Sequence, residues 1–478
     1  MSTSTRFKLL LFGFYLVLTA FLAAHHEPWR DEADTWLMAR DASFSTILKI
    51  SPHAGTPVLW HFFLKLFADQ GFSYGAQPVI NLLLVWAAVA FLLVYSPFSC
   101  STLLYICFGW LLSFEYPAVA RNYAFGFLGL MLLLSSFSSS KRWASLILGF
   151  LAWPILCFSS VHYLALVPAL MLLQLYCFDG GTHSHLNKAK VLWPLFWFCL
   201  AVYTLWPQKG GQFNTSFIHI ANLYHFFWAV SLGLFPGWSY KGIAAFIAPF
   251  LLFWIIKRTN PEIPRRKIIY FMLFCVNAIF VFKYFIPMHR FGGFNWLVIL
   301  VSSWIGLLLA QRTNSFPELS KKVAAFYGLL FVLNFPGTFV AWKNEIQKPF
   351  TDAGSTTRFL EENDYLKLPI ACFTGDLCSA LLVYTPEKIK FWYPGIDDWG
   401  THMFWDKRYK DSLKLSPVEA YQRSQDFFDR SFGETPFLFI SHFKLERPED
   451  LGLKLIWESP HQAWMRIDET FYVYLKSY

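Results

Sequence analysis

The sequence predicts a mainly α-helical, polytopic membrane protein that ends in a C-terminal α/β domain. Of its 478 residues, 55% are apolar and only 15% are charged, whereas a soluble globular domain carries roughly 25% charged residues. The apolar residues gather in blocks that are almost free of charge, such as 77–95, 191–206 and 294–310. A bilayer core of about 30 Å needs roughly 17–25 such residues in a helix. After about residue 342, charges and turn residues become frequent and no block is long enough to span.

Eleven spans give one threading that is consistent with the basic residues. We expect them at 7–24, 77–95, 98–114, 118–137, 143–158, 161–178, 191–206, 243–257, 268–286, 294–310 and 322–341. With the N-terminus in the cytoplasm, the multi-basic loops all fall inside, as the positive-inside rule requires. The apolar helices 56–68 and 218–236 must then lie along the membrane. The first outer loop, 25–76, and the domain 342–478 fall on the outer face. We therefore expect an integral protein of a plasma membrane, the inner membrane of a bacterium.

The domain that follows the membrane part, 342–478, alternates helical and strand-like patterns. Helices are expected at 354–363, 376–384 and 416–430, and strands at 368–373, 436–441, 452–457 and 469–475. Helices between short apolar strands favour an α/β layer domain. Cys372 and Cys378, six residues apart, can pair in an oxidising compartment, and the sequence leaves this pairing open.

The net charge of +9 does not indicate a nucleic-acid partner. The basic residues lie mainly in short loops between spans, where topology accounts for them. No basic stripe follows a folded face, so binding of nucleic acid is not expected.

An acidic cluster opens the first outer loop, in the run His25-His26-Glu27-Pro28-Trp29-Arg30-Asp31-Glu32-Ala33-Asp34-Thr35-Trp36-Leu37-Met38-Ala39-Arg40-Asp41. From Trp29 the pattern is that of an amphipathic helix, with Ala33, Trp36, Leu37 and Arg40 on one face. Asp31 and Asp34 share a face, and Glu32 is adjacent. Acids in a first helical turn can simply complement the helix dipole. Acids beside a bilayer are nevertheless expensive, which favours a functional use.

Cations on the same outer side are not explained by the usual charge bias. Arg121 and Tyr123 lie at the outer end of the next spans, and His289 with Arg290 lies in a later outer loop. Arg121 either extends to the interface or holds an anionic headgroup. A carboxylate can deprotonate an acceptor hydroxyl while Arg and His stabilise a departing phosphate. The combination indicates chemistry on a lipid-linked phosphate.

The acidic run resembles the first-loop motif of GT-C glycosyltransferases, which include protein O-mannosyltransferases and the aminoarabinose transferases of lipid A. The segment Gly55-Thr56-Pro57-Val58-Leu59-Trp60-His61-Phe62 is similar to their His-Pro-Pro-Leu-Tyr-Tyr juxtamembrane helix, with Gly and Thr in place of the His and the first Pro. The stretch from Tyr116 to Tyr123 is similar to their Ser-Arg-x-Tyr segment, and His289-Arg290 to their late basic pair.

This resemblance implies a polyprenyl-phosphate-sugar donor and an inverting transfer to an acceptor glycan, lipid or protein on the outer face. Asp31 is then the expected base, and Glu32 the residue that assists it. The expected substrate-binding residues are Arg30, Asp34, His61, Lys65, Arg121, Tyr123, His289 and Arg290. Members of this superfamily differ in metal dependence, so no metal or other cofactor is assigned and a divalent cation is left open.

Two rival functions use the same residues differently. A transporter or flippase of a lipid-linked glycan would need the charged cavity without covalent chemistry, but such proteins usually show internal repeats and broken spans at matching positions. A membrane scaffold whose outer domain binds a partner would not need the acidic cluster. Membrane lipids are partners in every case.

Overall fold

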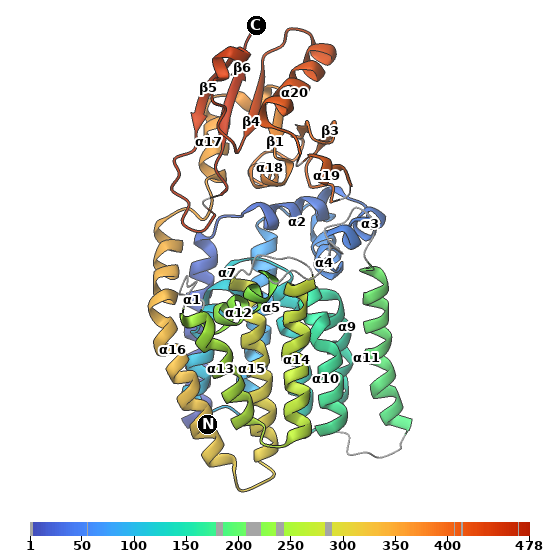
Figure 1. Cartoon of the computed structure of the whole chain (residues 1–478), viewed down its shortest axis with the longest axis vertical. Coiled ribbons are helices and arrows are strands. Elements are labelled where there is room, and N and C mark those ends of the chain that lie inside the picture. Colours follow the sequence, from blue (N-terminus) through green and yellow to red (C-terminus); the bar gives the residue numbers. More distant parts are fainter. Residues whose placement is uncertain are drawn as a thin grey trace. The chain divides into compact units, whose positions relative to one another are not determined.

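The computed structural model describes residues 3–54, 56–177, 185–206, 221–235, 243–282, 289–405, 407–412, 414–466 and 468–478. The fold is mainly helical, with one small sheet in its C-terminal part (Figure 1). The chain forms two compact units. Unit 1 comprises 1–24, 78–206 and 213–342, and unit 2 comprises 25–77, 207–212 and 343–478.

Unit 1 is a bundle of apolar helices that lie side by side in Figure 1. Its helices are α1 (Thr3–His25), α5 (Ala76–Tyr95), α6 (Cys100–Cys107), α7 (Tyr116–Ala118), α8 (Tyr123–Ser138), α9 (Arg142–Ser159), α10 (Val161–Cys177), α11 (His185–Thr204), α12 (Ala221–Leu234), α13 (Ile243–Thr259), α14 (Ile263–Phe282), α15 (His289–Ala310) and α16 (Phe316–Gln347). Among the described residues, five helices are long and apolar enough to cross a membrane: α1, α5, α9, α15 from Phe291, and α16. The eleven expected spans are thus found only in part.

The burial pattern of unit 1 is that of a bundle in lipid. Helix α15 is buried on all sides, with Leu297, Val298 and Leu300 fully inaccessible. Peripheral helices instead expose large apolar side chains, such as Leu10 at 75% and Val17 at 69% on α1. Exposing a leucine or valine to water costs about 1.5–3 kcal/mol each. Such a surface is stable when lipid covers it, so the coarse prediction of a membrane protein agrees with the fold.

The expected span 98–114 is wrong as a continuous helix. Helix α6 ends at Cys107, and a π-helical segment follows at Leu111–Glu115. Gly109 lies at the break, where its carbonyl accepts a hydrogen bond from the Ser113 hydroxyl at 2.9 Å. The next expected span, 118–137, begins instead at Tyr123. Near the start of that helix, Gly126 packs so closely that a Cβ there would lie 2.0 Å from the Tyr163 ring.

The two helices expected to lie along the membrane are partly present. The segment 56–68 forms α4 (Leu59–Ala68), which begins after Pro57. The segment 218–236 contains α12, and both ends of the segment lie outside the described residues. Their orientation in the bilayer stays a prediction.

Unit 2 contains the segment 25–77, which includes the expected first outer loop, and the C-terminal domain. The loop forms α2 (Arg30–Asp41), α3 (Phe44–Ala54) and α4. The C-terminal domain contains α17 (Ala353–Glu362), α18 (Gly375–Leu382), α19 (Lys407–Ser412) and α20 (Pro417–Phe432). Its strands are β1 (Ile370–Phe373), β2 (Phe391–Tyr393), β3 (Asp398–Gly400), β4 (Phe437–Ser441), β5 (Leu453–Glu458) and β6 (Tyr472–Lys476), in the order β3-β2-β1-β4-β6-β5.

The α/β prediction for this domain is confirmed by a sheet that has helices on both faces. Strand β1 pairs in parallel with β2 and β4, with Ala371 opposite Phe439, and the outer pairs are antiparallel. Alternate residues point to opposite faces. Cys372 therefore packs toward α17 and α18, while Ala371 packs toward α20. Cys372 and Cys378 form a disulfide between β1 and α18.

Helix α2 packs into the core of the C-terminal domain. Leu37 belongs to the same apolar cluster as Leu377 and Leu381 of α18. Every residue from Glu32 to Ala39 is buried, so the middle of the expected amphipathic helix is covered on all sides, while both ends stay partly exposed. The acids Glu32 and Asp34 are buried with it, which requires partners for both.

Candidate functional site

The site begins where α2 begins. Pro28 and the extended residue Trp29 precede the first turn, and the Glu32 side chain reaches back to within 3.5 Å of the Trp29 amide. This contact satisfies a donor that the helix itself leaves unpaired. Asp31 and Glu32 also place negative charge at the positive end of the helix. A structural role at the helix N-terminus therefore accounts for part of what Glu32 does.

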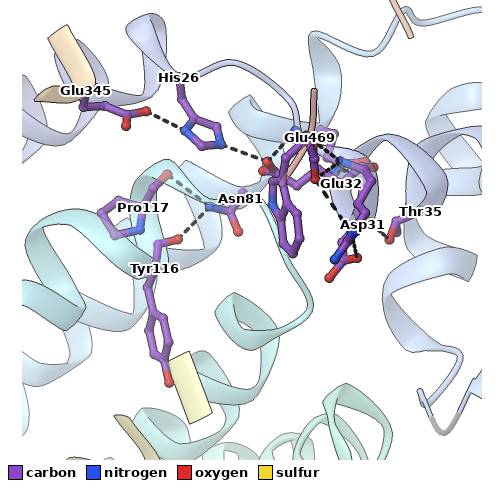
Figure 2. A network of polar contacts seen from close by, with 12 residues as sticks. His26, Asp31, Glu32, Thr35, Asn81, Tyr116, Pro117, Glu345 and Glu469 are labelled. Carbon is purple, nitrogen blue, oxygen red and sulfur yellow. Dashed lines mark hydrogen bonds and ion pairs between the residues drawn. The ribbon is translucent and has the colours of Figure 1, made fainter. Parts of the chain in front are cut away.

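A buried histidine bridges two carboxylates next to this turn (Figure 2). His26 Nε2 lies 2.8 Å from Glu32 Oε2, and Nδ1 lies 2.5 Å from Glu345 Oε1, with 3% or less of each side chain exposed. The indole N–H of Trp464 donates to the other Glu345 oxygen at 3.0 Å. Burial disfavours the charged imidazole, but the two carboxylates outweigh it and raise the pKa of His26 to about 10. His26 is therefore a buried cation at neutral pH.

Arg30 is the second cation of the site, and three acids surround it. Its guanidinium lies 3.9 Å from Asp31, 3.4 Å from Asp468 and 3.8 Å from Glu469. Glu469 is fully buried, and burial raises its pKa to about 8 although Arg30 and Arg466 oppose that shift.

Asp31 is accessible, as is Asp468, whose side chain is 52% exposed. The Asp31 side chain is 30% exposed, whereas those of Glu32 and Glu469 are 0% exposed. The hydroxyl of Thr35 donates to the Asp31 carbonyl at 2.6 Å, which fixes the backbone of the turn (Figure 2). The site thus presents a reachable carboxylate on a helix turn that buried ion pairs hold in place.

Asp34, a predicted substrate-binding residue, contacts the C-terminal domain. Its two oxygens accept hydrogen bonds from the Met403 amide at 2.7 Å and the Trp405 indole at 3.0 Å. Farther along α2, the Thr401 hydroxyl donates to Asp41, whose pKa is lowered because hydrogen bonds from Arg40 and Thr401 outweigh burial. These contacts attach α2 to the segment after β3.

His61 and Lys65 lie on α4, which packs against α2, and both are buried. The Lys65 ammonium donates to the Ala39 carbonyl at 3.3 Å and to Asp69 at 2.8 Å. Lys65 therefore contacts the end of α2 that is distant from Asp31.

The other predicted residues belong to unit 1. Tyr123 stacks on Tyr116 with ring centres 6.2 Å apart, and the Tyr163 hydroxyl donates to the Tyr116 hydroxyl at 3.3 Å. The Asn81 amide donates to the carbonyls of Tyr116 and Pro117, which fixes the turn before Tyr123 (Figure 2). Arg121 in that turn is partly exposed. His289 and Arg290 begin α15, and their side chains lie outside the described part of the chain.

Three residues of the candidate site were not predicted from the sequence: His26, Glu345 and Glu469. His26 stands beside the acidic run, and its position offered a signal. Glu345 lies 319 residues from His26, and Glu469 lies 439 residues from Arg30. No local pattern links residues so far apart. Among the described residues, no group of three or more His, Cys, Asp or Glu side chains is arranged to hold a metal ion.

Comparison of the chain with protein-family models, with curated protein sequences and with solved structures found no match.

Proposed function

We propose that the protein is a glycosyltransferase of the GT-C type, which moves a sugar from a polyprenyl-phosphate donor to an acceptor hydroxyl on the outer face of the membrane. The observation that carries the proposal is the accessibility of Asp31 on a helix turn that is held in place. Asp31 is the accessible carboxylate in the first turn of α2, and buried partners hold the surrounding Glu32 and Arg30. A general base needs this combination of access and fixed position.

The proposed reaction is a single displacement. The acceptor hydroxyl gives its proton to the Asp31 carboxylate, and its oxygen attacks the anomeric carbon. The bond between that carbon and the phosphate oxygen breaks, so polyprenyl phosphate leaves with both electrons and the configuration inverts. Arg121, Tyr123, His289 and Arg290 are the proposed residues for the donor headgroup, since guanidinium groups bind phosphate in a fixed planar geometry.

We propose supporting roles for the remaining acids of unit 2. Glu32 pairs with the buried cation His26 and anchors the turn. Asp34 has both oxygens engaged by residues 403–405, so we assign it to attachment of α2. The disulfide Cys372–Cys378 supports placing this domain outside the cytoplasm, where disulfides persist.

The test is transfer by purified protein in lipid nanodiscs. Wild type, Asp31→Asn and the control Asp364→Asn would be incubated with polyprenyl-phosphate sugars and candidate acceptors, and products measured by mass spectrometry. Asp364 is an exposed acid of the same unit that pairs with Lys367 in an i,i+3 contact. Transfer by wild type and Asp364→Asn, but not by Asp31→Asn, is the expected result. Full transfer by Asp31→Asn would refute the mechanism.

A transporter of a lipid-linked glycan is the second candidate, and one observation favours it. The helix break at Phe108–Gly109 and the π-helical segment that ends at the buried Glu115 resemble the interrupted helices of transporters. A transporter would move a fluorescent lipid-linked glycan from one leaflet of a proteoliposome membrane to the other without releasing polyprenyl phosphate. Release of that product with transfer of the sugar would exclude this candidate.

A further inference from the structure

The loop that joins β5 to β6, residues 459–471, places the carboxyl group of Glu469 beside the first turn of α2. Backbone hydrogen bonds hold described residues of this loop: the amides of Trp464 and Arg466 donate to the carbonyls of Pro349 and Phe350, each at 3.1 Å. The amide of Glu469 donates to the Arg466 carbonyl at 3.0 Å. The position of Glu469 is therefore determined by the fold of the C-terminal domain.

The Glu469 carboxyl meets Arg30 at two places. Both carboxyl oxygens lie 3.4 Å from the Arg30 amide nitrogen, and one lies 3.8 Å from Nε of its guanidinium. The carboxyl of Asp468 lies 3.4 Å from another guanidinium nitrogen. A further contact fixes Arg30 from the opposite side of its backbone, because the Ser379 hydroxyl donates to the Arg30 carbonyl at 3.1 Å.

The same guanidinium is the neighbour of Asp31. Nε of Arg30 lies 3.9 Å from Asp31 Oδ1, so Asp31 and Glu469 share one counter-charge. Glu469 is completely buried and cannot touch a substrate, whereas Asp31 is accessible. Any change in how Glu469 holds Arg30 must therefore change the charge that Asp31 experiences.

We propose that Glu469 is a positioning residue that acts through Arg30 to set the orientation and charge balance of Asp31. This assigns the C-terminal domain a part in the site. The inference rests on the proposed function for the statement that Asp31 is the base, while the coupling of Glu469 to Asp31 stands on geometry alone.

The ionisation of Glu469 gives this coupling a measurable signal. Burial raises the pKa of Glu469 from 4.5 to about 8. The charged and titratable groups around it are Arg30 and Asp31 of α2, Arg466 and Asp468 of its own loop, and Tyr384 after α18. A carboxyl group with a raised folded-state pKa loses stability as pH rises from the unfolded value through the folded value. Its cost therefore grows between pH 4.5 and 8 and is constant above pH 8.

The first experiment needs no enzymatic activity. Melting temperatures of the full chain in detergent are compared between wild type and Glu469→Gln from pH 5 to 9.5. The glutamine imitates the protonated acid, so we expect equal melting temperatures near pH 5 and a glutamine variant that is more stable by roughly 10 °C above pH 8. The other ionisable groups are present in both proteins, so their contributions cancel when the two melting temperatures are subtracted at each pH.

The same pair is then compared in an Asp31→Asn background. Without the negative charge of Asp31, ionised Glu469 is repelled less and no longer shares Arg30. The pH at which the difference in melting temperature levels off should therefore fall by about half a unit. An Asp364→Asn background, which changes an exposed acid of the same unit, should leave it unchanged. If Asp31→Asn does not move this pH, Glu469 and Asp31 are uncoupled and the proposal is wrong. If Glu469→Gln does not fold, the melting temperatures of wild type and Asp31→Asn are compared over the same pH range. The pH at which the melting temperature levels off should then be lower in Asp31→Asn, and an equal value would refute the coupling.

The second experiment measures transfer. We expect wild-type kcat to fall about tenfold between pH 7 and 9, as ionised Glu469 draws Arg30 away from Asp31, because a misplacement of about 1 Å costs up to 10²-fold. The kcat of Glu469→Gln should not depend on pH in this range, and KM for the donor should be equal in both. Identical pH profiles would overturn the positioning role and leave the transferase intact. Absence of transfer in wild type would overturn the proposed function, and the melting experiment would still decide the coupling.

Discussion

Replacing His26 by glutamine should strongly destabilise unit 2. The change keeps a polar side chain and removes the positive charge that lies between Glu32 and Glu345. Both carboxylates would remain buried without a counter-charge. Breaking a buried ion pair in this way costs about 3–5 kcal/mol.

The raised pKa of His26 has the same physical cause and agrees with this magnitude. Its rise from 6.5 to about 10 in the folded protein corresponds to roughly 5 kcal/mol, at about 1.4 kcal/mol for each pKa unit. A group whose pKa is raised by folding contributes its full stabilisation below the unfolded value. The contribution of His26 is therefore complete below pH 6.5, decreases as pH rises, and is lost above pH 10.

The assay is thermal unfolding of the full chain in detergent at pH 6 and pH 9.5, followed by tryptophan fluorescence. At pH 6, His26→Gln should lower the melting temperature of unit 2 by about 10 °C, since about 1 kcal/mol corresponds to 2–4 °C for a unit of this size. The loss should be much smaller at pH 9.5. His461→Gln is the matched control, because His461 is 47% exposed and lies 3.3 Å from Glu458. Exposed pairs contribute only about 0–1 kcal/mol. Equal melting temperatures for the two variants at pH 6, or an equal loss for His26→Gln at both pH values, would refute the buried-cation interpretation.

Three further expectations follow from the site and the threading. Asp31→Asn should reduce transfer about 10²–10⁴-fold, the usual loss for a general base, and should change stability by no more than about 1 kcal/mol; a large loss of stability with normal turnover would mean that Asp31 only complements the helix dipole. Arg121→Lys should weaken binding of the donor, because an ammonium cannot reproduce the planar guanidinium fork; an unchanged affinity in Arg121→Ala, measured by titration with labelled donor, would make Arg121 an interface anchor. A reporter fused after Lys343 should be active outside the cytoplasm and one inserted in 258–267 inside it, and the opposite result at either position would overturn the eleven-span threading.

Much of the C-terminal domain was predictable because its periodic elements are long enough to show a pattern. The expected helix 416–430 is α20 (Pro417–Phe432), and its start is marked in sequence by Ser416 and Glu419, which cap each other. The expected strand 436–441 is β4. Strands β2 and β3 were missed, since each has three residues and a period of two cannot be recognised over that length.

The membrane part and the site were predictable to a lesser degree. Hydropathy identifies apolar runs, but it does not distinguish one span from two segments separated by a break, as at Gly109 in the expected span 98–114. Helix α2 and its acids were recognised from local pattern. Their burial was not, because the residues that cover them come from α18, from the segment after β3 and from the β5–β6 loop. Partners that are hundreds of residues apart leave no periodicity in the sequence.

The insertion of α2 into the C-terminal domain affects how the protein is made. Arg30 and its partner Glu469 are separated by 439 residues, and ribosomes add about 5–20 residues per second. The β5–β6 loop is therefore synthesised roughly 20–90 s after α2. During that interval Leu37 and Asp34 lack neighbours that bury them in the finished protein. Helix α2 is thus made long before the residues that complete its surroundings.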